Sequence, residues 1–373
     1  MRQTTASLMV PIVAALFVAV GCDSSGQSGS PRAEQSTVQM VTAAKAFLEG
    51  LTPEESAAAV FSTMGDAART SWSNLPAMFV ERRGVRMGDL SDEQRRGLHR
   101  LLRASSSSQG YQKLAGIIRL DEVLKHEATA AVESGERRLP PELIESWTSE
   151  NYWVSFYGAP EVGATWGWQL SGHHLAANFT VVDSRLSFTP LFLGAEPNEV
   201  RSGLEAGWRI LSHEAERGFE LLQALRPGQR RQAVLAMDTP DDILTGPGRK
   251  GSLKTYTGLP ASEMDEAQLM LLWALMDEFI SNVDSDAAAA QLAKIQNDGL
   301  ESLHFAWIGP EDDASGRYYY RVHGPSVLIE YVVEEGVGGA AANHVHSIVR
   351  DPGNDYGENW LGAHYEEHHQ RIR

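Results

Sequence analysis

The chain has 373 residues, enough for one large domain or two ordinary ones with a sizeable core. Its formal net charge is −17, with 49 acidic against 32 basic residues. Phosphate binding needs a basic patch, so this balance argues against a nucleic-acid partner. The chain has one cysteine, which rules out a disulfide within it.

The start of the chain predicts an export signal at residues 1–22. Arg2 supplies a short positively charged N-terminal region, and residues 8–20 form an apolar run too short to span a bilayer in the mature protein. The run ends in Ala19-Val20-Gly21-Cys22, which resembles a bacterial lipobox, in which the cysteine is lipidated after cleavage. We therefore expect Cys22 to be lipidated and to anchor the protein to a membrane of the cell envelope, on its periplasmic or extracellular face. The alternative is an ordinary secretory signal followed by an unmodified cysteine. The Ser- and Gly-rich residues 23–37 are expected to form a flexible tether.

The remaining residues, 38–373, are predicted to form a single α+β domain. Apolar residues follow a helical spacing in several segments: most of 38–147, then 198–224, 228–237, 262–281, 285–297 and 358–369. The spacing changes to the period of two that is typical of strands at 151–193 and 302–350. These patterns predict two antiparallel strand blocks that form a β-core flanked by helices.

The two strand blocks resemble each other. Their segments align in pairs: 153–158 with 304–309, and 168–172 with 320–324. In this alignment His174 corresponds to Ser326, and Asn178 corresponds to Glu330. The alignment predicts a duplicated β-core with pseudo-twofold symmetry. Strand and glycine patterns alone can also produce such a similarity.

Histidines in both strand blocks are candidate metal ligands. His344 and His346 are two residues apart in a predicted strand, so their rings share a face and their backbones are about 7 Å apart. Strand parity places His174 on a polar face and His173 on the apolar one, where we expect it to pack or bond to backbone. His304 begins a further aromatic strand. The four predicted ligands, His174, His304, His344 and His346, would suit Zn²⁺, Cu²⁺ or Fe²⁺ with an open position for water.

Glu330 is a single acid within the otherwise apolar run 327–333. A carboxylate there must be paired, bind a metal or face a cavity, because burying it alone is costly. We expect it to be a general base, or else to pair with Arg321 or Arg350. Arg350 and Asp351 follow the histidine pair and are candidate catalytic residues, which would orient an imidazole or bind an anionic group.

Aromatic residues in both blocks support a second interpretation, a groove for a glycan or small organic ligand. The candidate substrate-binding residues are Trp166, Trp168, Asn178, Trp307 and Tyr320.

Eight short motifs form a set: Trp166-Gly167-Trp168, Gly172-His173-His174-Leu175, Asn178-Phe179-Thr180, Phe192-Leu193-Gly194-Ala195, Val200-Arg201-Ser202-Gly203, His304-Phe305-Ala306-Trp307, Tyr319-Tyr320-Arg321 and Asn343-His344-Val345-His346-Ser347. Together they resemble a bacterial family of domains of unknown function, numbered 3500 (DUF3500). The resemblance extends over about residues 40–366 and implies one family-wide domain. The family has no established activity, so the resemblance implies only that the His and Asn motifs belong together.

The chain departs from the family pattern at two places. His323 replaces the usual Gln before a Gly-Pro turn, and residues 334–339 replace a loop rich in acids and amides. If that loop supplies a ligand, Glu334 or Glu335 must provide it.

The leading hypothesis is a cell-envelope lipoprotein with a His-rich divalent-metal site that acts as a metal-dependent hydrolase, with Glu330 as the base. The alternative is a non-catalytic lipoprotein that binds a glycan or small organic molecule in an aromatic-lined groove.

Overall fold

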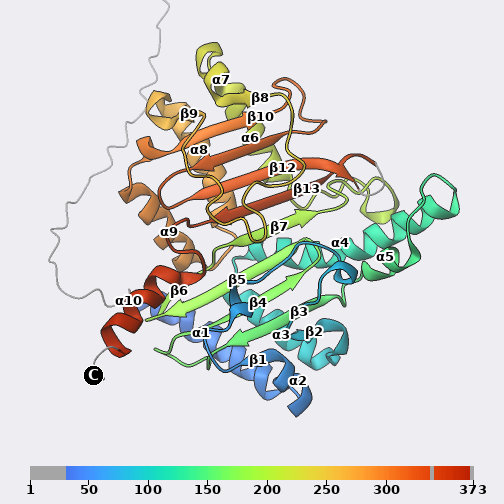
Figure 1. Cartoon of the computed structure of the whole chain (residues 1–373), viewed down its shortest axis with the longest axis vertical. Coiled ribbons are helices and arrows are strands. Elements are labelled where there is room, and N and C mark those ends of the chain that lie inside the picture. Colours follow the sequence, from blue (N-terminus) through green and yellow to red (C-terminus); the bar gives the residue numbers. More distant parts are fainter. Residues whose placement is uncertain (1–30, 337–339, 370–373) are drawn as a thin grey trace, which may run out of the picture.

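The computed structural model describes residues 31–336 and 340–369. This part of the chain contains ten α-helices and thirteen β-strands, and all thirteen strands belong to one mixed sheet (Figure 1). The predicted α+β class is therefore confirmed. Cys22 and the predicted signal lie outside the described residues. Within the described ranges, no helix combines the length and the apolar character that crossing a membrane requires.

Two antiparallel blocks meet at the centre of the sheet. The first block is β3 (Tyr152–Tyr157), β4 (Trp166–Gly172), β5 (Leu175–Val182) and β7 (Leu191–Ala195). The second block is β10 (His304–Ile308), β11 (Tyr319–His323), β12 (Leu328–Gly336) and β13 (Ala340–Arg350). Strands β7 and β13 pair with each other and so join the blocks.

Five short strands complete the sheet. In the first block they are β1 (Val60–Phe61), β2 (Val85–Arg86) and β6 (Arg185–Ser187), and in the second β8 (Val234–Ala236) and β9 (Leu259–Pro260). Strand β1 pairs in parallel with β3, as β8 does with β10. Strand β2 pairs antiparallel with β3, as β9 does with β10. The two halves therefore contain the same strands in the same order, apart from β6.

The strand register also agrees with the predicted duplication. Paired residues of the first block correspond by strand and register to paired residues of the second: Phe156–Trp168 to Trp307–Tyr320, and Gln169–Asn178 to Arg321–Glu330. The pair Ala177–Leu191 corresponds to Ile329–Val349. Because Leu191 is paired with Val349, the pseudo-twofold axis passes through that pair.

The helices repeat in the same way. Each half has a short and a long helix with matching starts: α2 (Pro53–Ala59) and α3 (Asp92–Ser105), and α7 (Pro227–Ala233) and α8 (Glu266–Ile280). In all four, the third residue's side chain accepts from the N-cap backbone N–H. The Gln94 amide of α3 donates to Gly50 O at 2.9 Å, and Gln268 of α8 donates to Ala224 O at 2.8 Å. The same capping and helix-to-loop contacts therefore recur in both halves.

The other helices fill the space around these pairs. They are α1 (Pro31–Glu49), α4 (Ser108–Glu133), α5 (Pro141–Ser146), α6 (Ser212–Ala224), α9 (Ser285–Asn297) and α10 (Glu358–His369). Helix α1 begins at Pro31, within residues 23–37 that were predicted to form a tether, and residues 23–30 lie outside the described part of the chain. Proline is favoured in the first turn of a helix, which suits this start.

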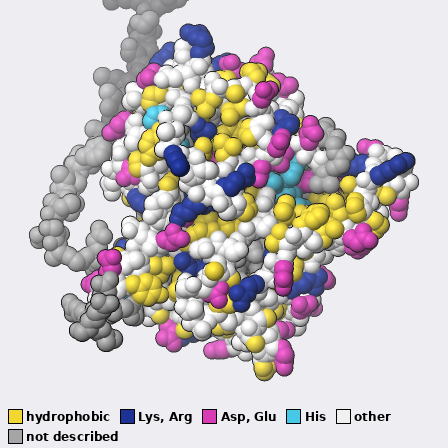
Figure 2. Space-filling model, in the orientation of Figure 1, with side chains coloured by type: hydrophobic (Ala, Val, Ile, Leu, Met, Phe, Trp, Pro, Cys, Tyr) yellow, Lys and Arg dark blue, Asp and Glu magenta, His cyan; other side chains and the backbone are white. Residues whose placement is uncertain are grey.

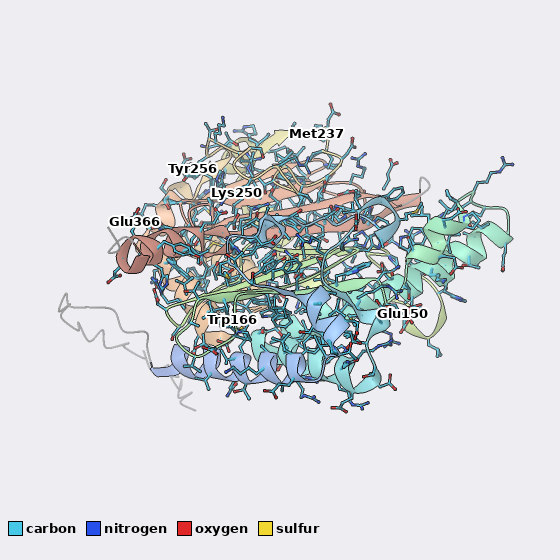
Figure 3. All side chains as sticks on the ribbon, turned by 60° about the horizontal axis from the view of Figure 1, so that its bottom comes forward. Glu150, Trp166, Met237, Lys250, Tyr256 and Glu366 are labelled. Carbon is cyan, nitrogen blue, oxygen red and sulfur yellow. The ribbon has the colours of Figure 1, made fainter. Side chains whose placement is uncertain are left out.

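Strand alternation gives the sheet two different faces. The face under the helices is an aromatic core: Tyr152, Phe156, Trp166, Trp168, Phe179, Trp307, Tyr320 and Tyr331. The opposite face carries buried polar residues: Ser155, Gln169, Ser171, Asn178, Arg321, Glu330, His346 and Arg350. In Figure 3 Trp166 lies on the side of the sheet toward α1, whereas Met237, Lys250 and Tyr256 lie on the other side.

Two long segments, 62–84 and 237–258, run across the polar face (Figure 1). The first falls inside the predicted helical region 38–147, and β8 falls inside the predicted helix 228–237, so both predictions are wrong there. The predicted helix 198–224 likewise forms only from Ser212 onward. Local apolar spacing does not reveal that these segments cover a sheet rather than form helices.

Candidate metal centre

Three imidazoles from two distant parts of the chain meet on the polar face. The Nε2 atom of His344 lies 2.8 Å from Nε2 of His174 and 2.9 Å from Nε2 of His346. Ligand nitrogens 2.0–2.1 Å from a tetrahedral zinc ion would be about 3.3 Å apart, so a small widening would admit an ion. These three residues can hold a metal ion. They are three of the four predicted ligands.

The backbone fixes the direction of each ring. His344 and His346 lie on one face of β13, as predicted from their spacing, while Val345 packs in the aromatic core. His174 is not in a strand, contrary to the parity argument that selected it. It occupies the turn between β4 and β5 with a left-handed φ of 59°, and Gly194 N donates to its carbonyl at 2.8 Å. The turn therefore points the ring toward β13.

Gly194 of β7 leaves the space in which two of these rings lie. It is paired with His346 in the sheet. A Cβ at this position would come within 2.9 Å of His346 Cδ2 and 3.1 Å of His174 Cδ2. A larger residue would therefore push the imidazoles out of position.

Two carboxylates hold the outer side of His346. Its Nδ1 lies 3.0 Å from Asp242 Oδ1 and 2.8 Å from Glu334 Oε1. The nitrogen has one proton to donate, and Asp242 is the aligned hydrogen-bond acceptor. Glu334 also approaches His344, with Oε2 at 3.7 Å from Nδ1. Carboxylates in this place fix the tautomer of metal-binding histidines and direct Nε2 at the ion.

A third carboxylate supports His174 through its neighbour. The ring of His173 lies on the ring of His174, with centroids 3.7 Å apart. Nδ1 of His173 lies 2.6 Å from Asp121 Oδ1 in α4, and Tyr152 donates to the other oxygen of Asp121 at 2.8 Å. His173 is therefore buried as expected, but its partner is a carboxylate rather than backbone.

Burial and charge affect the three imidazoles differently. Burial lowers the pKa of His344 and places the pKa of His174 well below its usual value. Burial alone would also lower the pKa of His346, but Asp242 and Glu334 outweigh it and raise that pKa to about 9. The His344 side chain is 12% exposed, which leaves a route from solvent. Figure 2 shows a place on this face where histidine and acidic side chains reach the surface beside a hydrophobic stretch.

His304 does not belong to this cluster. Strands β11 and β12 separate β10 from β13, which is about 14 Å across the sheet. The His304 ring stacks on Tyr256 with centroids 5.6 Å apart, and its Nδ1 lies 3.2 Å from Ser302 O. The prediction included it because the sequence does not show the strand order.

Glu330 lies on the polar face but holds a loop rather than serving as a base at the histidines. It accepts from Leu244 N at 2.7 Å, Thr245 N at 2.9 Å and the Tyr319 hydroxyl at 2.8 Å. These bonds secure the segment that carries Asp242. The expected pairing with Arg321 or Arg350 is replaced by these backbone contacts.

Arg350 and Asp351 also have structural partners. Arg350 donates to Thr245 O at 2.6 Å and to Asp355 Oδ2 at 2.6 Å. Asp351 accepts from Lys294 of α9 at 2.5 Å. Neither contacts the imidazoles, because Arg350 is the last residue of β13 and Asp351 follows it.

The predicted aromatic groove is absent from the described residues. Trp166, Trp168, Trp307 and Tyr320 are at most 1% exposed, because strand alternation places all four under the helices. Asn178 lies on the polar face, where it accepts from Gln169 Nε2 and donates to Pro190 O.

Sequence reasoning missed Asp121, Asp242 and Gly194 as parts of the centre, and named Glu334 only as a substitute ligand. Asp121 could have been found, since it lies on the apolar face of α4 with Ile117 and Leu124. Asp242 gives no such signal, because its role depends on how segment 237–258 crosses the sheet.

Replacing Gly194 with Ala should weaken metal binding by about tenfold or more, because the added methyl displaces ligand rings. Gly316→Ala, where a Cβ meets nothing within 4 Å, is the matched control. Competition with a chelating dye measures both affinities. Equal affinities for the two variants would contradict the role given to Gly194.

Comparisons with known proteins give a family but no activity. Neither the curated proteins nor the solved structures include a match to this chain. The family model described as "Protein of unknown function (DUF3500)" matches residues 33–358. That match covers most of the chain and includes the three clustered histidines. The chain therefore belongs to the DUF3500 family.

Proposed function

We propose that this protein binds one divalent transition-metal ion, with Zn²⁺ the best fit, and uses it for hydrolysis. The convergence of the Nε2 atoms of His174, His344 and His346 carries the proposal. Three imidazoles with an open position are one of the protein ligand sets found in catalytic zinc sites. Cu²⁺ and Fe²⁺ are also compatible with imidazole ligands.

The charges around the cluster support a divalent cation. Asp242 and Glu334 together carry two negative charges against the outer edge of His346. An ion at the three Nε2 atoms would take the place of the extra proton of His346 as the positive charge facing these carboxylates. Arg249 donates to Asp242 Oδ2 at 2.8 Å and keeps the other carboxylate oxygen directed at His346.

Different residues of the chain would have different roles in such a site. When bound, the ion supplies Lewis acidity and makes a water molecule nucleophilic near neutral pH. The Nδ1–H group of His346 donates a hydrogen bond to Asp242, which leaves the lone pair of Nε2 free for the ion. Phe192 lies against the His346 ring, with centroids 5.2 Å apart, and shields that side from water. The partly exposed His344 marks the side from which substrate would approach.

The first test is metal content. The full chain, prepared anaerobically without chelator or reconstituted with Zn²⁺, Cu²⁺ or Fe²⁺, should bind close to one ion. His344→Ala and His346→Ala should each lose most of that affinity, whereas His304→Ala should keep it, since His304 lies in another part of the sheet. Atomic absorption gives the stoichiometry, and chelator-sensitive cleavage of ester, amide and phosphoester substrates gives the activity. Failure of all three ions to bind would remove the proposal, as would equal losses in the three variants.

The second test is proton release. With its pKa raised to about 9, His346 holds an extra proton at neutral pH, and that proton must leave when an ion binds. His174 and His344, whose pKa values are lowered, are already neutral and release none. Binding should therefore release close to one proton at pH 7, and affinity should rise by up to about tenfold per pH unit below pH 9. Calorimetry in two buffers of different ionisation enthalpy measures the release, and a value near zero would contradict this account.

We also propose that the protein acts at the cell envelope, anchored to a membrane through a lipid on Cys22. The support is the apolar run 8–20 and the lipobox-like ending at Cys22. Expressed in a bacterium, the wild-type chain should partition into detergent, whereas Cys22→Ser should not. Mass spectrometry of the N-terminal peptide identifies the modification. An unmodified cysteine in the mature wild-type chain would rule out the anchor.

A further inference from the structure

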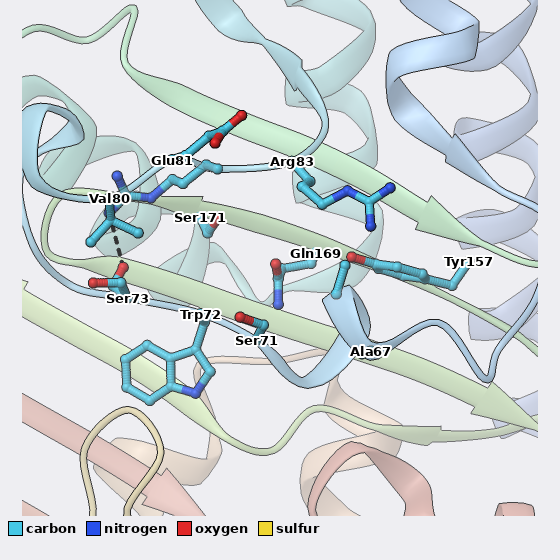
Figure 4. Close-up of a pocket in the computed structure, with 12 residues that line it drawn as sticks. Ala67, Ser71, Trp72, Ser73, Val80, Glu81, Arg83, Tyr157, Gln169 and Ser171 are labelled. Carbon is cyan, nitrogen blue, oxygen red and sulfur yellow. Dashed lines mark hydrogen bonds between the residues drawn. The ribbon is translucent and has the colours of Figure 1, made fainter.

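A cavity lies on the polar face of the first block, beneath segment 62–84. Its volume is about 300 Å³, at the lower end of the range for small-molecule sites. Figure 4 shows Gln169 near its centre, with Ser71, Ser171 and Tyr157 around it. Gln169 and Ser171 rise from β4 as its floor, while Ser71 belongs to the covering segment.

The hydrogen bonds beneath the cavity determine which atom of the Gln169 side-chain amide faces the cavity. Pro190 O can only accept, so Asn178 must turn its amide nitrogen toward it, at 2.7 Å. The Asn178 oxygen then accepts from Gln169 Nε2 at 2.5 Å. Gln169 Oε1, which has no partner among the described residues, is left for the cavity. The floor therefore offers a fixed acceptor that needs a donor from a ligand.

Two hydroxyls extend this polar floor. Ser71 and Ser171 both line the cavity, and no hydrogen bond to either hydroxyl is seen within the described ranges. A hydroxyl both donates and accepts, so these groups complement ligand hydroxyls. The aromatic rings of Trp72 and Tyr157 supply apolar wall next to them.

Of the three charged residues of the lining, only Arg82 is partly buried. Its Nη2 donates to Ser73 O at 3.0 Å and Leu75 O at 2.5 Å, while its Nε and Nη1 are buried without a partner in the described chain. Glu81 and Arg83 are both exposed. A charged group on the neutral floor would lose its hydration without a counter-ion, which is costly. The neutral floor thus favours an uncharged ligand, and hydroxyl oxygens of such a ligand can also accept from the unpartnered Arg82 donors.

The other half of the molecule shows that this space is specific to the first block. The positions of Gln169 and Asn178 are occupied there by Arg321 and Glu330. Glu330 draws the covering segment down through Leu244 N and Thr245 N, and the Tyr319 ring fills the space beside it. The residue that corresponds to Tyr319 is Gly167. In the first block a neutral amide pair thus stands where, in the second, a charged pair includes the carboxylate that holds the covering segment.

We propose that this cavity is a binding site for a small uncharged molecule rich in hydroxyl groups, of the size of a single sugar ring. Its hydroxyls donate to Gln169 Oε1 and exchange hydrogen bonds with Ser71 and Ser171. Its apolar ring edge packs on the aromatic wall. The site is separate from the histidine cluster and does not depend on a bound ion. The two are neighbours, because Trp72 contacts Phe192 and Phe192 contacts His346.

The test is calorimetric titration of the full chain with D-glucose, N-acetyl-D-glucosamine and myo-inositol, and with L-glutamate and inorganic phosphate as charged probes. At least one uncharged probe should bind and neither charged probe should. Ser71→Ala and Ser171→Ala should each weaken that binding about fivefold, the effect of one lost hydrogen bond. Ser262→Ala, an exposed serine in the second block, is the matched control and should leave it unchanged.

Ser71 is exposed and without a partner in the described chain, so its loss cannot act through folding. Binding should be the same in chelated and metal-loaded protein, which separates this proposal from the metal centre. Absence of binding by all three uncharged probes at tens of millimolar would overturn the proposal. So would binding of the charged probes alone, or equal affinities in the Ser71, Ser171 and Ser262 variants.

Discussion

The pairing of β7 with β13 is the contact on which the rest of the structure depends. It joins the two blocks into one sheet and places His346 directly opposite Gly194. Gly194 in turn binds the backbone of His174 and leaves room for the imidazoles. Histidines separated by 170 residues in the chain thus meet because one strand from each half lies at the centre of the sheet.

Both candidate sites lie where the two halves differ. The fold repeats strand register, helix caps and covering segments, so a symmetric molecule would have each feature twice. The residue that corresponds to His174 is Ser326, and no second histidine cluster forms around it in the described chain. The cavity likewise lies where the Gln169–Asn178 pair takes the place of the Arg321–Glu330 pair. The two halves share a scaffold through the pseudo-twofold repeat, and both candidate sites are built from residues that differ between the halves.

The sequence correctly predicts which side chains of one strand share a face, because that property follows from the alternation along the strand. The alternation at residues 344–350 places His344 and His346 on one face correctly, and the aligned strand blocks agree with the observed register. It does not predict which strands are neighbours, and for that reason His304 was grouped with histidines three strands away. Nor does it show which face the helices cover, so Trp166 and Trp307 were expected in a groove but lie in the core. The position of the Asp242 carboxylate depends on the path of segment 237–258, and the local sequence has no pattern that predicts this path.

The most direct measurement of the central claim is anomalous X-ray diffraction from crystals of the metal-reconstituted protein, recorded on both sides of the metal absorption edge. The account predicts one strong peak about 2.0–2.1 Å from each Nε2 atom of His174, His344 and His346. A peak at another place, with these three imidazoles still in mutual contact, would contradict it.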